Sequence, residues 1–257
     1  MRMRKLFSWL IILSVIFFDR YGVAQSPLSV VIDPGHGGKD SGAVSGDGIK
    51  EKDVVLSISK KLADILRRCG MNPLLTRRKD RFVALKSRIR FTNRQNPVLC
   101  VSIHANASKS HGVNGFEAYV NNNCSANRKF IDLLKFSDPI LLSSKTRNYK
   151  SMQLAYFINE GLSRYVQAKN RGIKEGQFYI VRRVKAPCVL VETGFLSNKK
   201  EALRLSSDRY QKKIACGLAE GIVTALYGEV GKLRPIIIAK EKNVMKILGE
   251  KVVRYKN

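Results

Sequence analysis

The 257-residue sequence is poor in acidic residues: 20 aspartates and glutamates stand against 47 lysines and arginines, giving a formal net charge of +27. The first 25 residues contribute four basic residues and one acidic residue, so the rest of the chain still carries +24. A charge of this size predicts an anionic partner. No motif with basic and aromatic residues interleaved is present, so we do not expect that partner to be nucleic acid.

Cysteine is also used in a way that excludes two classes of protein. The number is odd and no two cysteines have C-x-x-C spacing, which argues against a complete disulfide framework and against a common zinc-binding pattern. Cys100 and Cys188 lie in apolar, strand-like runs and are predicted to be buried, inert thiols. The cysteines are Cys69, Cys100, Cys124, Cys188 and Cys216.

The N-terminal apolar run, residues 6–18, is shorter than the roughly 20 residues that a membrane-spanning helix needs. Arg2, Arg4 and Lys5 precede it, and small residues follow at 22–24. This order is typical of a secretory signal peptide, so we predict that residues 1–25 direct export and are then removed. A buried helix and an uncleaved membrane anchor are the alternatives. The expected location is the periplasm or another extracytoplasmic compartment, with membrane association left open.

Strand and helix patterns alternate along most of the remaining chain, which predicts one α/β domain over residues 26–227. Such alternation is typical of a mostly parallel sheet with helices on both faces. We predict strands at 30–33, 72–77, 98–103, 115–120, 177–182 and 188–191, and helices at 52–69, 84–96, 152–165 and 208–226.

Two segments lack a clear pattern. Residues 121–150 read as an insertion, either an ordinary surface segment or a lid over the site, because long irregular connections in compact domains are often functional. Residues 228–257 form a C-terminal tail with eight basic and three acidic residues. We expect this tail to dock on the domain, a membrane or a partner.

Three of the predicted strands end in a residue that could bind a metal or catalyse a reaction: His36, His104 and Glu192. Glu51 stands at the start of the first predicted helix, just before residue 52, where a carboxylate also suits the helix dipole. His36 lies in a glycine-rich loop that, taken alone, fits either a phosphate cradle or a metal site. Two histidines at one sheet edge with nearby carboxylates favour the metal site.

Two imidazoles and a carboxylate are the protein ligands of one type of catalytic zinc site, whose fourth position is open to water. The metal lowers the pKa of bound water from 15.7 toward about 7 and polarises the carbonyl under attack. A second carboxylate must then move the proton to the leaving nitrogen, and Glu192 is placed for that role. The helical H-E-x-x-H motif of common metalloproteases is absent.

Four sequence blocks make the chain similar to the zinc-dependent N-acetylmuramoyl-L-alanine amidases of the type 3 family. They are DPGHGGKD at 33–40, KEKD at 50–53, SIHANA at 102–107 and LVETGFLSN at 190–198. The resemblance implies a six-stranded α/β domain with one zinc ion per chain, held by His36, Glu51 and His104, and catalytic Glu192. It also implies cleavage of the amide between N-acetylmuramic acid and L-alanine in peptidoglycan or its precursors.

Several secondary assignments follow. Asp33 could orient a ligand histidine by a hydrogen bond without binding the metal itself, or it could only stabilise the turn. Asn106 could hold substrate or backbone. His111 is expected at the surface, and Arg182 and Arg183 could meet a stem-peptide carboxylate or simply be solvated.

The charge of the chain and the family resemblance also predict its partners. We expect a monomer whose anionic partner is peptidoglycan or a muropeptide, an anionic membrane, or a lipid-linked precursor. Some similar amidases carry an inserted helix that covers the zinc until an activator protein moves it, so an activator is also predicted. A stem-peptide peptidase on the same scaffold and a non-catalytic wall-binding protein are the alternatives.

Overall fold

The computed structural model describes residues 27–121 and 146–227. The predicted signal peptide, residues 122–145 of the 121–150 insertion and the 228–257 tail lie outside these residues. The helices and strands, in chain order, are β1 (Ser29–Pro34), α2 (Glu51–Arg68), β2 (Asn72–Leu75), α3 (Leu85–Gln95), β3 (Leu99–Asn106), β4 (Phe116–Asn121), α5 (Arg147–Tyr165), β5 (Asn170–Gly176), α6 (Tyr179–Arg183), β6 (Cys188–Phe195), α7 (Lys199–Ser206) and α8 (Asp208–Tyr227).

A six-stranded sheet with the order β2-β1-β3-β6-β4-β5 forms the centre of the domain. All neighbouring strands run parallel except β4 and β6, which are antiparallel. The prediction of an α/β domain with a mostly parallel six-stranded sheet is therefore confirmed. In the parallel part, the carboxyl ends of β1, β3 and β6 meet at one edge, where ligands gather in such sheets.

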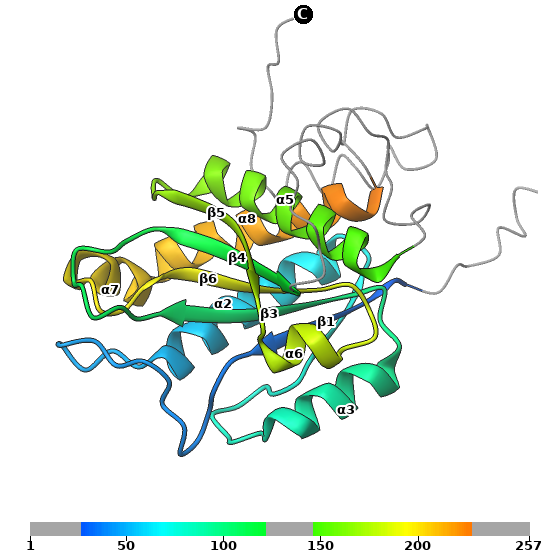
Figure 1. Ribbon diagram of the computed structural model, residues 1–257, viewed down its shortest axis with the longest axis horizontal. Helices are drawn as coiled ribbons and strands as arrows, with labels where there is room; N and C mark the ends of the chain where they lie inside the picture. The colour runs from blue at the N-terminus through cyan, green and yellow to red at the C-terminus, as the bar shows by residue number, and fades with distance from the viewer. Residues whose placement is uncertain (1–26, 122–145, 228–257) are drawn as a thin grey trace, which may run out of the picture.

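Helices cover the two faces of the sheet unequally (Figure 1). Helices α2, α5 and α8 pack on one face over the larger hydrophobic cluster, which includes Ile32, Val101 and Val191. The shorter helices α3 and α6 lie on the other face over a smaller cluster that includes Val31 and Leu190. The side chains of each central strand thus alternate between two buried clusters, as expected for a sheet covered on both sides.

One predicted strand is wrong. Residues 177–182 were expected to form a strand from their alternation, but α6 begins at Tyr179. Ile180, Val181 and Val184 are all buried against the sheet, a spacing that a single helical turn satisfies. The short alternating run was therefore one turn of helix beneath the smaller cluster.

Two elements were not predicted. β5 is an edge strand without one fully buried residue, and it contains two glycines, so it carries little apolar signal. α7 has only eight residues and is marked by its cap, since the Asn198 side chain accepts a hydrogen bond from the Glu201 backbone N–H. α5 begins at Arg147, five residues before the predicted start.

The buried-thiol prediction is confirmed: Cys100 and Cys188 are fully buried and directly opposite each other in β3 and β6. Neither forms a disulfide. In residues 27–121 and 146–227, every helix is too short or too polar to traverse a lipid bilayer.

Candidate functional site

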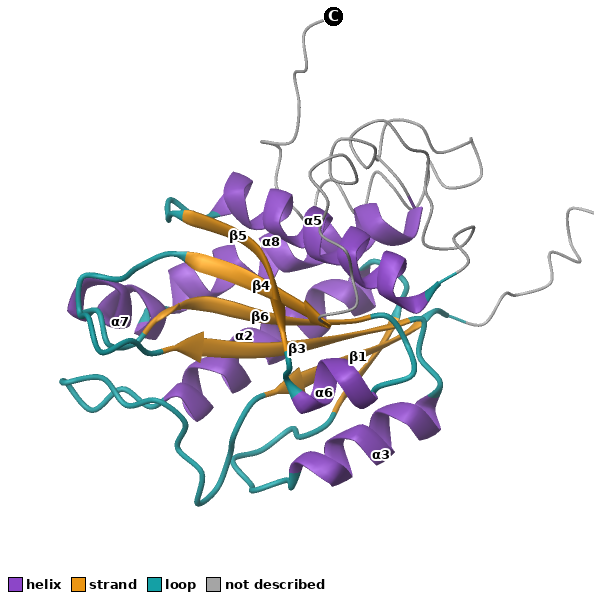
Figure 2. Cartoon of the chain, in the orientation of Figure 1, coloured by secondary structure: helices purple, strands orange, loops and turns teal. Residues whose placement is uncertain are grey.

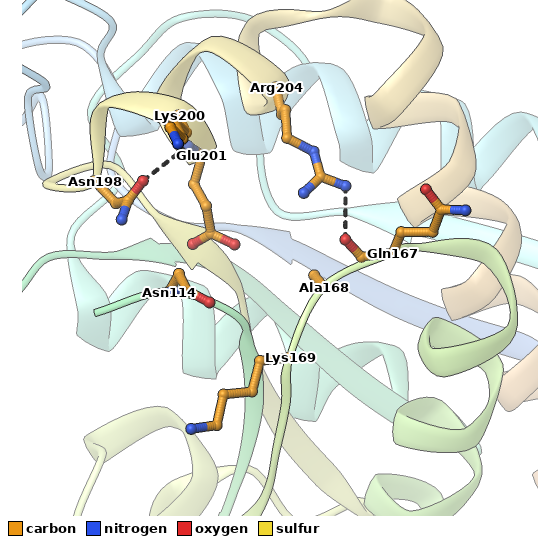
Figure 3. A pocket seen from close by; sticks show the side chains of 8 residues that line it. All are labelled: Asn114, Gln167, Ala168, Lys169, Asn198, Lys200, Glu201 and Arg204. Carbon is orange, nitrogen blue, oxygen red and sulfur yellow. Dashed lines mark hydrogen bonds between the residues drawn. The ribbon is translucent and has the colours of Figure 1, made fainter. Parts of the chain in front are cut away.

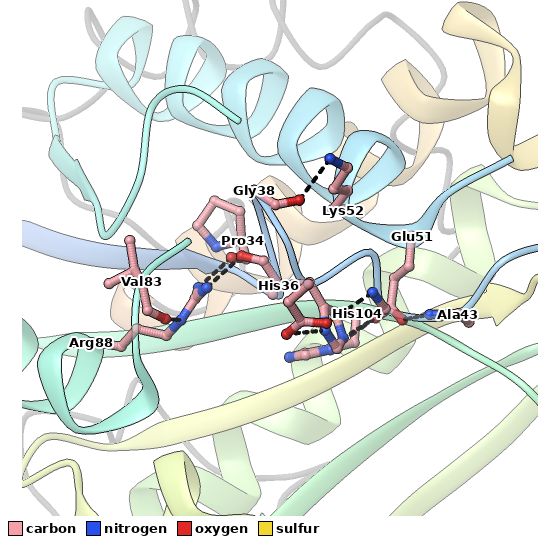
Figure 4. Close-up of polar contacts among 12 residues, drawn as sticks. Pro34, His36, Gly38, Ala43, Glu51, Lys52, Val83, Arg88 and His104 are labelled. Atoms are coloured by element: carbon pink, nitrogen blue, oxygen red, sulfur yellow. Dashed lines mark hydrogen bonds and ion pairs between the residues drawn. The ribbon is translucent and has the colours of Figure 1, made fainter. Parts of the chain in front are cut away.

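The structure brings the predicted ligands together at the carboxyl edge of the sheet (Figure 4). His36 follows the end of β1, His104 lies near the end of β3 and Glu51 is the first residue of α2. One potential ligand atom from each of the three side chains lies within 4.8 Å of the other two. This group of residues could hold a metal ion.

Glu51 lies at the centre of this group. Its Oε1 atom is 3.1 Å from His36 Nε2 and 2.9 Å from His104 Nδ1. The same oxygen accepts a hydrogen bond from the Ala105 N–H, and Oε2 accepts one from the Ala43 N–H. Burial would raise the pKa of this carboxyl, but the hydrogen bonds from His104 and His36 outweigh burial and hold the pKa far below its usual range. The two histidines therefore favour the ionised carboxylate form of Glu51, which is the form that can bind a metal ion.

His36 is held from its other side by Asp40, whose Oδ2 lies 2.9 Å from His36 Nδ1. This contact leaves Nε2 as the nitrogen that faces Glu51 and fixes the orientation of the ring. The His36 backbone adopts φ 57°, a left-handed conformation that is uncommon for a residue with a side chain. The sequence analysis missed this role of Asp40. The one signal that could have predicted it is the position of an acidic residue four places after His36 in the same short loop.

Two buried arginines hold the backbone of the histidine loop. Arg77 donates hydrogen bonds to the carbonyl oxygens of Pro34 and Gly35. Arg88 donates to the carbonyl oxygens of Pro34 and His36. Because both guanidinium groups are almost fully buried, these bonds are shielded from water and fix the loop strongly.

Asp33 supports Arg88. Its Oδ1 accepts from Arg88 and Thr76, and its Oδ2 accepts from Ser102. Burial alone would raise the pKa of Asp33, but the Arg88 charge and these hydrogen bonds lower it. Asp33 thus reaches His36 through Arg88 and the His36 carbonyl, whereas Asp40 contacts the imidazole ring.

Two glycines leave the space that the ligand side chains occupy. A Cβ atom at Gly35 would lie 2.3 Å from the His104 ring. A Cβ atom at Gly42 would lie 2.5 Å from Glu51 Oε2 and 2.7 Å from His36 Cδ2, and Gly42 has φ 64°. Either position therefore excludes any larger residue on steric grounds.

Glu192 lies in β6 directly opposite His104 of β3, so the two side chains emerge side by side on the same face of the sheet. Glu192 is only 7% exposed, and its Oε2 atom has no hydrogen-bond partner in the described part of the chain. Burial raises its pKa to about 7. A carboxyl with this pKa can accept and release a proton near neutral pH.

The raised pKa of Glu192 predicts a pH-dependent penalty on stability. Below pH 4.5 the carboxyl is protonated in both the folded and the unfolded protein; as pH rises toward 7 the unfolded chain ionises first, so the folded state loses stability. In chelator-treated protein, we expect the unfolding free energy of the wild type to fall by about 3 kcal/mol relative to E192Q between pH 4.5 and pH 7.5. Urea titrations of both proteins across this range measure it, and parallel curves would contradict it.

The β4 residue Glu117 was not predicted as part of the site. It is the Cα partner of Glu192 across the antiparallel β4–β6 pair, and it is buried. Asn106, which we expected to hold substrate or backbone, donates a hydrogen bond from Nδ2 to Glu117 Oε1, while its Oδ1 accepts one from the Ala107 N–H. Asn106 thus joins the second-histidine strand to Glu117.

The remaining predicted residues are not members of the ligand group. His111 is exposed, as expected, with its Nδ1 atom 2.8 Å from the Ser197 carbonyl oxygen. Arg182 and Arg183 are exposed on α6, and the Arg183 guanidinium lies over the Tyr179 ring.

A separate hollow of about 330 Å³ lies beside α7 (Figure 3). Its lining consists of Asn114, Gln167, Ala168, Lys169, Asn198, Lys200, Glu201 and Arg204. Neither Glu192 nor the three potential ligands contribute to it.

Residues 30–224 match the family described as N-acetylmuramoyl-L-alanine amidase. The chain belongs to this family. The amidase is therefore a hydrolase, and the substrate of the family is peptidoglycan. The matched residues include all three potential ligands and Glu192.

Individual relatives agree with this assignment. The amidase is 30% identical to AmiA of Escherichia coli over 218 residues, which cover 76% of this chain and 75% of that protein. Among solved structures, AmiC2 of Nostoc punctiforme has 37% identity and a TM-score of 0.65, with 77% of this chain and 97% of that chain covered. CwlD of Clostridioides difficile, solved in complex with the GerS lipoprotein, has 29% identity and a TM-score of 0.66, with 77% and 98% covered.

Proposed function

We propose that this amidase is zinc-dependent and hydrolyses the amide between the lactyl group of N-acetylmuramic acid and L-alanine. One observation carries the proposal: His36, Glu51 and His104 converge at a single point, and the unpartnered carboxyl of Glu192 lies on the neighbouring strand. Two imidazoles and one carboxylate are a known ligand set for catalytic zinc. The donor atoms of this structure therefore fit that metal.

His36 Nε2, His104 Nδ1 and Glu51 would hold the ion, with Asp40 keeping the His36 ring in place. Bound zinc would polarise the scissile carbonyl and make water a better nucleophile. Glu192 takes a proton from the attacking water, whose oxygen bonds to the carbonyl carbon. As the carbon–nitrogen bond breaks, Glu192 delivers the proton to the leaving nitrogen of L-alanine.

The test uses purified protein and defined muropeptides, with and without chelator. We expect release of the intact stem peptide and a muramic acid with a free lactyl carboxyl, both identified by mass spectrometry. Chelation should stop the reaction and added zinc should restore it. Cleavage within the peptide, or turnover that persists after verified metal removal, would refute the proposal.

We also propose export to an extracytoplasmic compartment, on the basis of the charged and apolar N-terminal segment at 1–25. The substrate is found there, and the basic chain suits anionic wall material. Four further expectations stay predictions: that 121–150 forms a lid, that the tail docks, that an activator exists, and that the protein is a monomer. The complex of CwlD with the GerS lipoprotein shows that a relative binds another protein.

A further inference from the structure

A second polar cluster surrounds Glu117, one strand away from Glu192. Directly opposite residues of antiparallel strands project from the same face of a sheet, so the Glu117 and Glu192 side chains are neighbours on the face that carries His104. Tyr119 and Asn106 donate hydrogen bonds to Glu117 Oε1. The cluster is thus continuous with the candidate active site.

Two cations reach Glu117 from the edge strand β5, which lies next to β4 (Figure 2). Arg171 Nε is 2.8 Å and Lys174 Nζ is 2.5 Å from Glu117 Oε2. One buried carboxylate therefore faces two positive charges, which leaves a surplus charge of +1. Glu192 Oε2 does not take up this surplus, because it has no hydrogen-bond partner among the described residues.

The surplus cation is accessible. The Lys174 side chain is 37% exposed and that of Arg171 is 26% exposed, whereas Glu117 is 2% exposed. A lysine ammonium can donate three hydrogen bonds, and within residues 27–121 and 146–227 the Lys174 ammonium has one hydrogen-bond acceptor, Glu117. Lys174 therefore has free donors held in a fixed position beside the site, which is the arrangement that binds an anion.

We propose that Lys174, assisted by Arg171, binds a free carboxylate on the stem-peptide residue that follows L-alanine. The inference rests on the proposed function, because Glu192 then marks the scissile nitrogen. An extended dipeptide spans about 7 Å. β5 lies two strand spacings from β6, or about 10 Å. The Lys174 side chain covers part of that distance, because it reaches Glu117 on the intervening strand β4. A glutamate that follows L-alanine and is joined to the next residue through its side chain keeps its α-carboxylate free to meet Lys174.

The experiment compares two muramyl peptides that differ only at the second residue, with the α-carboxyl free in one and amidated in the other. We expect the wild type to prefer the free carboxylate by about tenfold or more in kcat/KM, mainly through KM, since a charge-assisted hydrogen bond is lost on amidation. Lys174→Gln should bring the two values close together, and Lys174→Arg should keep the preference. The control is Lys185→Gln, which removes an exposed lysine from the segment between α6 and β6. This variant should keep the wild-type ratio of the two kcat/KM values.

Two results would overturn the inference: a wild type that cleaves both peptides equally, or a Lys174→Gln variant that loses activity on both by the same factor. Zinc content and circular dichroism of each variant establish that the fold and metal centre are intact. A wild type that cleaves neither peptide would instead reject the proposed function.

Discussion

Replacing Glu192 with glutamine is expected to reduce amide hydrolysis by about 10³-fold or more while the zinc stays bound. A general acid–base group contributes about 10²–10⁴-fold, and glutamine has nearly the same shape but cannot accept the proton. Glu192 is buried beside His104 and is not one of the three converging ligands, so metal content should not change. Stopped-time assays with mass spectrometry measure the rate, and elemental analysis measures the zinc.

A matched control is Glu175→Gln, which changes an exposed glutamate on the edge strand β5. It should retain wild-type turnover. If E192Q kept more than about a tenth of the wild-type rate, general acid–base catalysis by Glu192 would be excluded, because that loss is smaller than such a group contributes.

His36→Ala is expected to remove zinc from the protein and with it the activity. Only two of the three protein ligands would remain, and changes even to residues that merely orient a ligand cost about 10–100-fold in metal affinity. We therefore expect a loss above about 100-fold, measured by competition with a chromogenic chelator. His111→Ala is the control, because His111 is exposed and contacts the Ser197 carbonyl.

The two histidine variants separate metal binding from folding. Far-ultraviolet circular dichroism should match the wild type for both proteins, since β1 is buried whether or not the imidazole is present. A His36→Ala protein that binds one zinc ion with wild-type affinity would contradict the ligand assignment.

The sequence was sufficient to predict five of the six strands and to place His36, His104 and Glu192 at the carboxyl edge of the sheet. Buried parallel strands are short apolar runs, and three of the runs in this sequence are followed by a residue that could bind a metal or catalyse a reaction. The edge strand β5 gave no such signal, because an edge needs few apolar residues. The 177–182 alternation was misread since a run this short fits both periods.

The support of the site was harder to predict. Asp40 is local to His36, but Arg88 meets the His36 carbonyl across 52 residues of sequence and Arg171 meets Glu117 across 54. The first contact depends on α3 packing against β1, and the second depends on the strand order, which places β5 beside β4. A single sequence does not determine which distant residues meet, so no role was predicted for Arg88 or Arg171.

The bonds from the two buried arginines also determine when the loop that carries His36 becomes ordered. The bonds from Arg77 and Arg88 to the loop carbonyls are internal to the chain and form as the domain folds. The conformational entropy of the loop is therefore lost during folding and not at metal uptake. Under the proposed function, the His36 loop would already be ordered when the ion arrives, and a protein stripped of its metal would take the ion up again without unfolding.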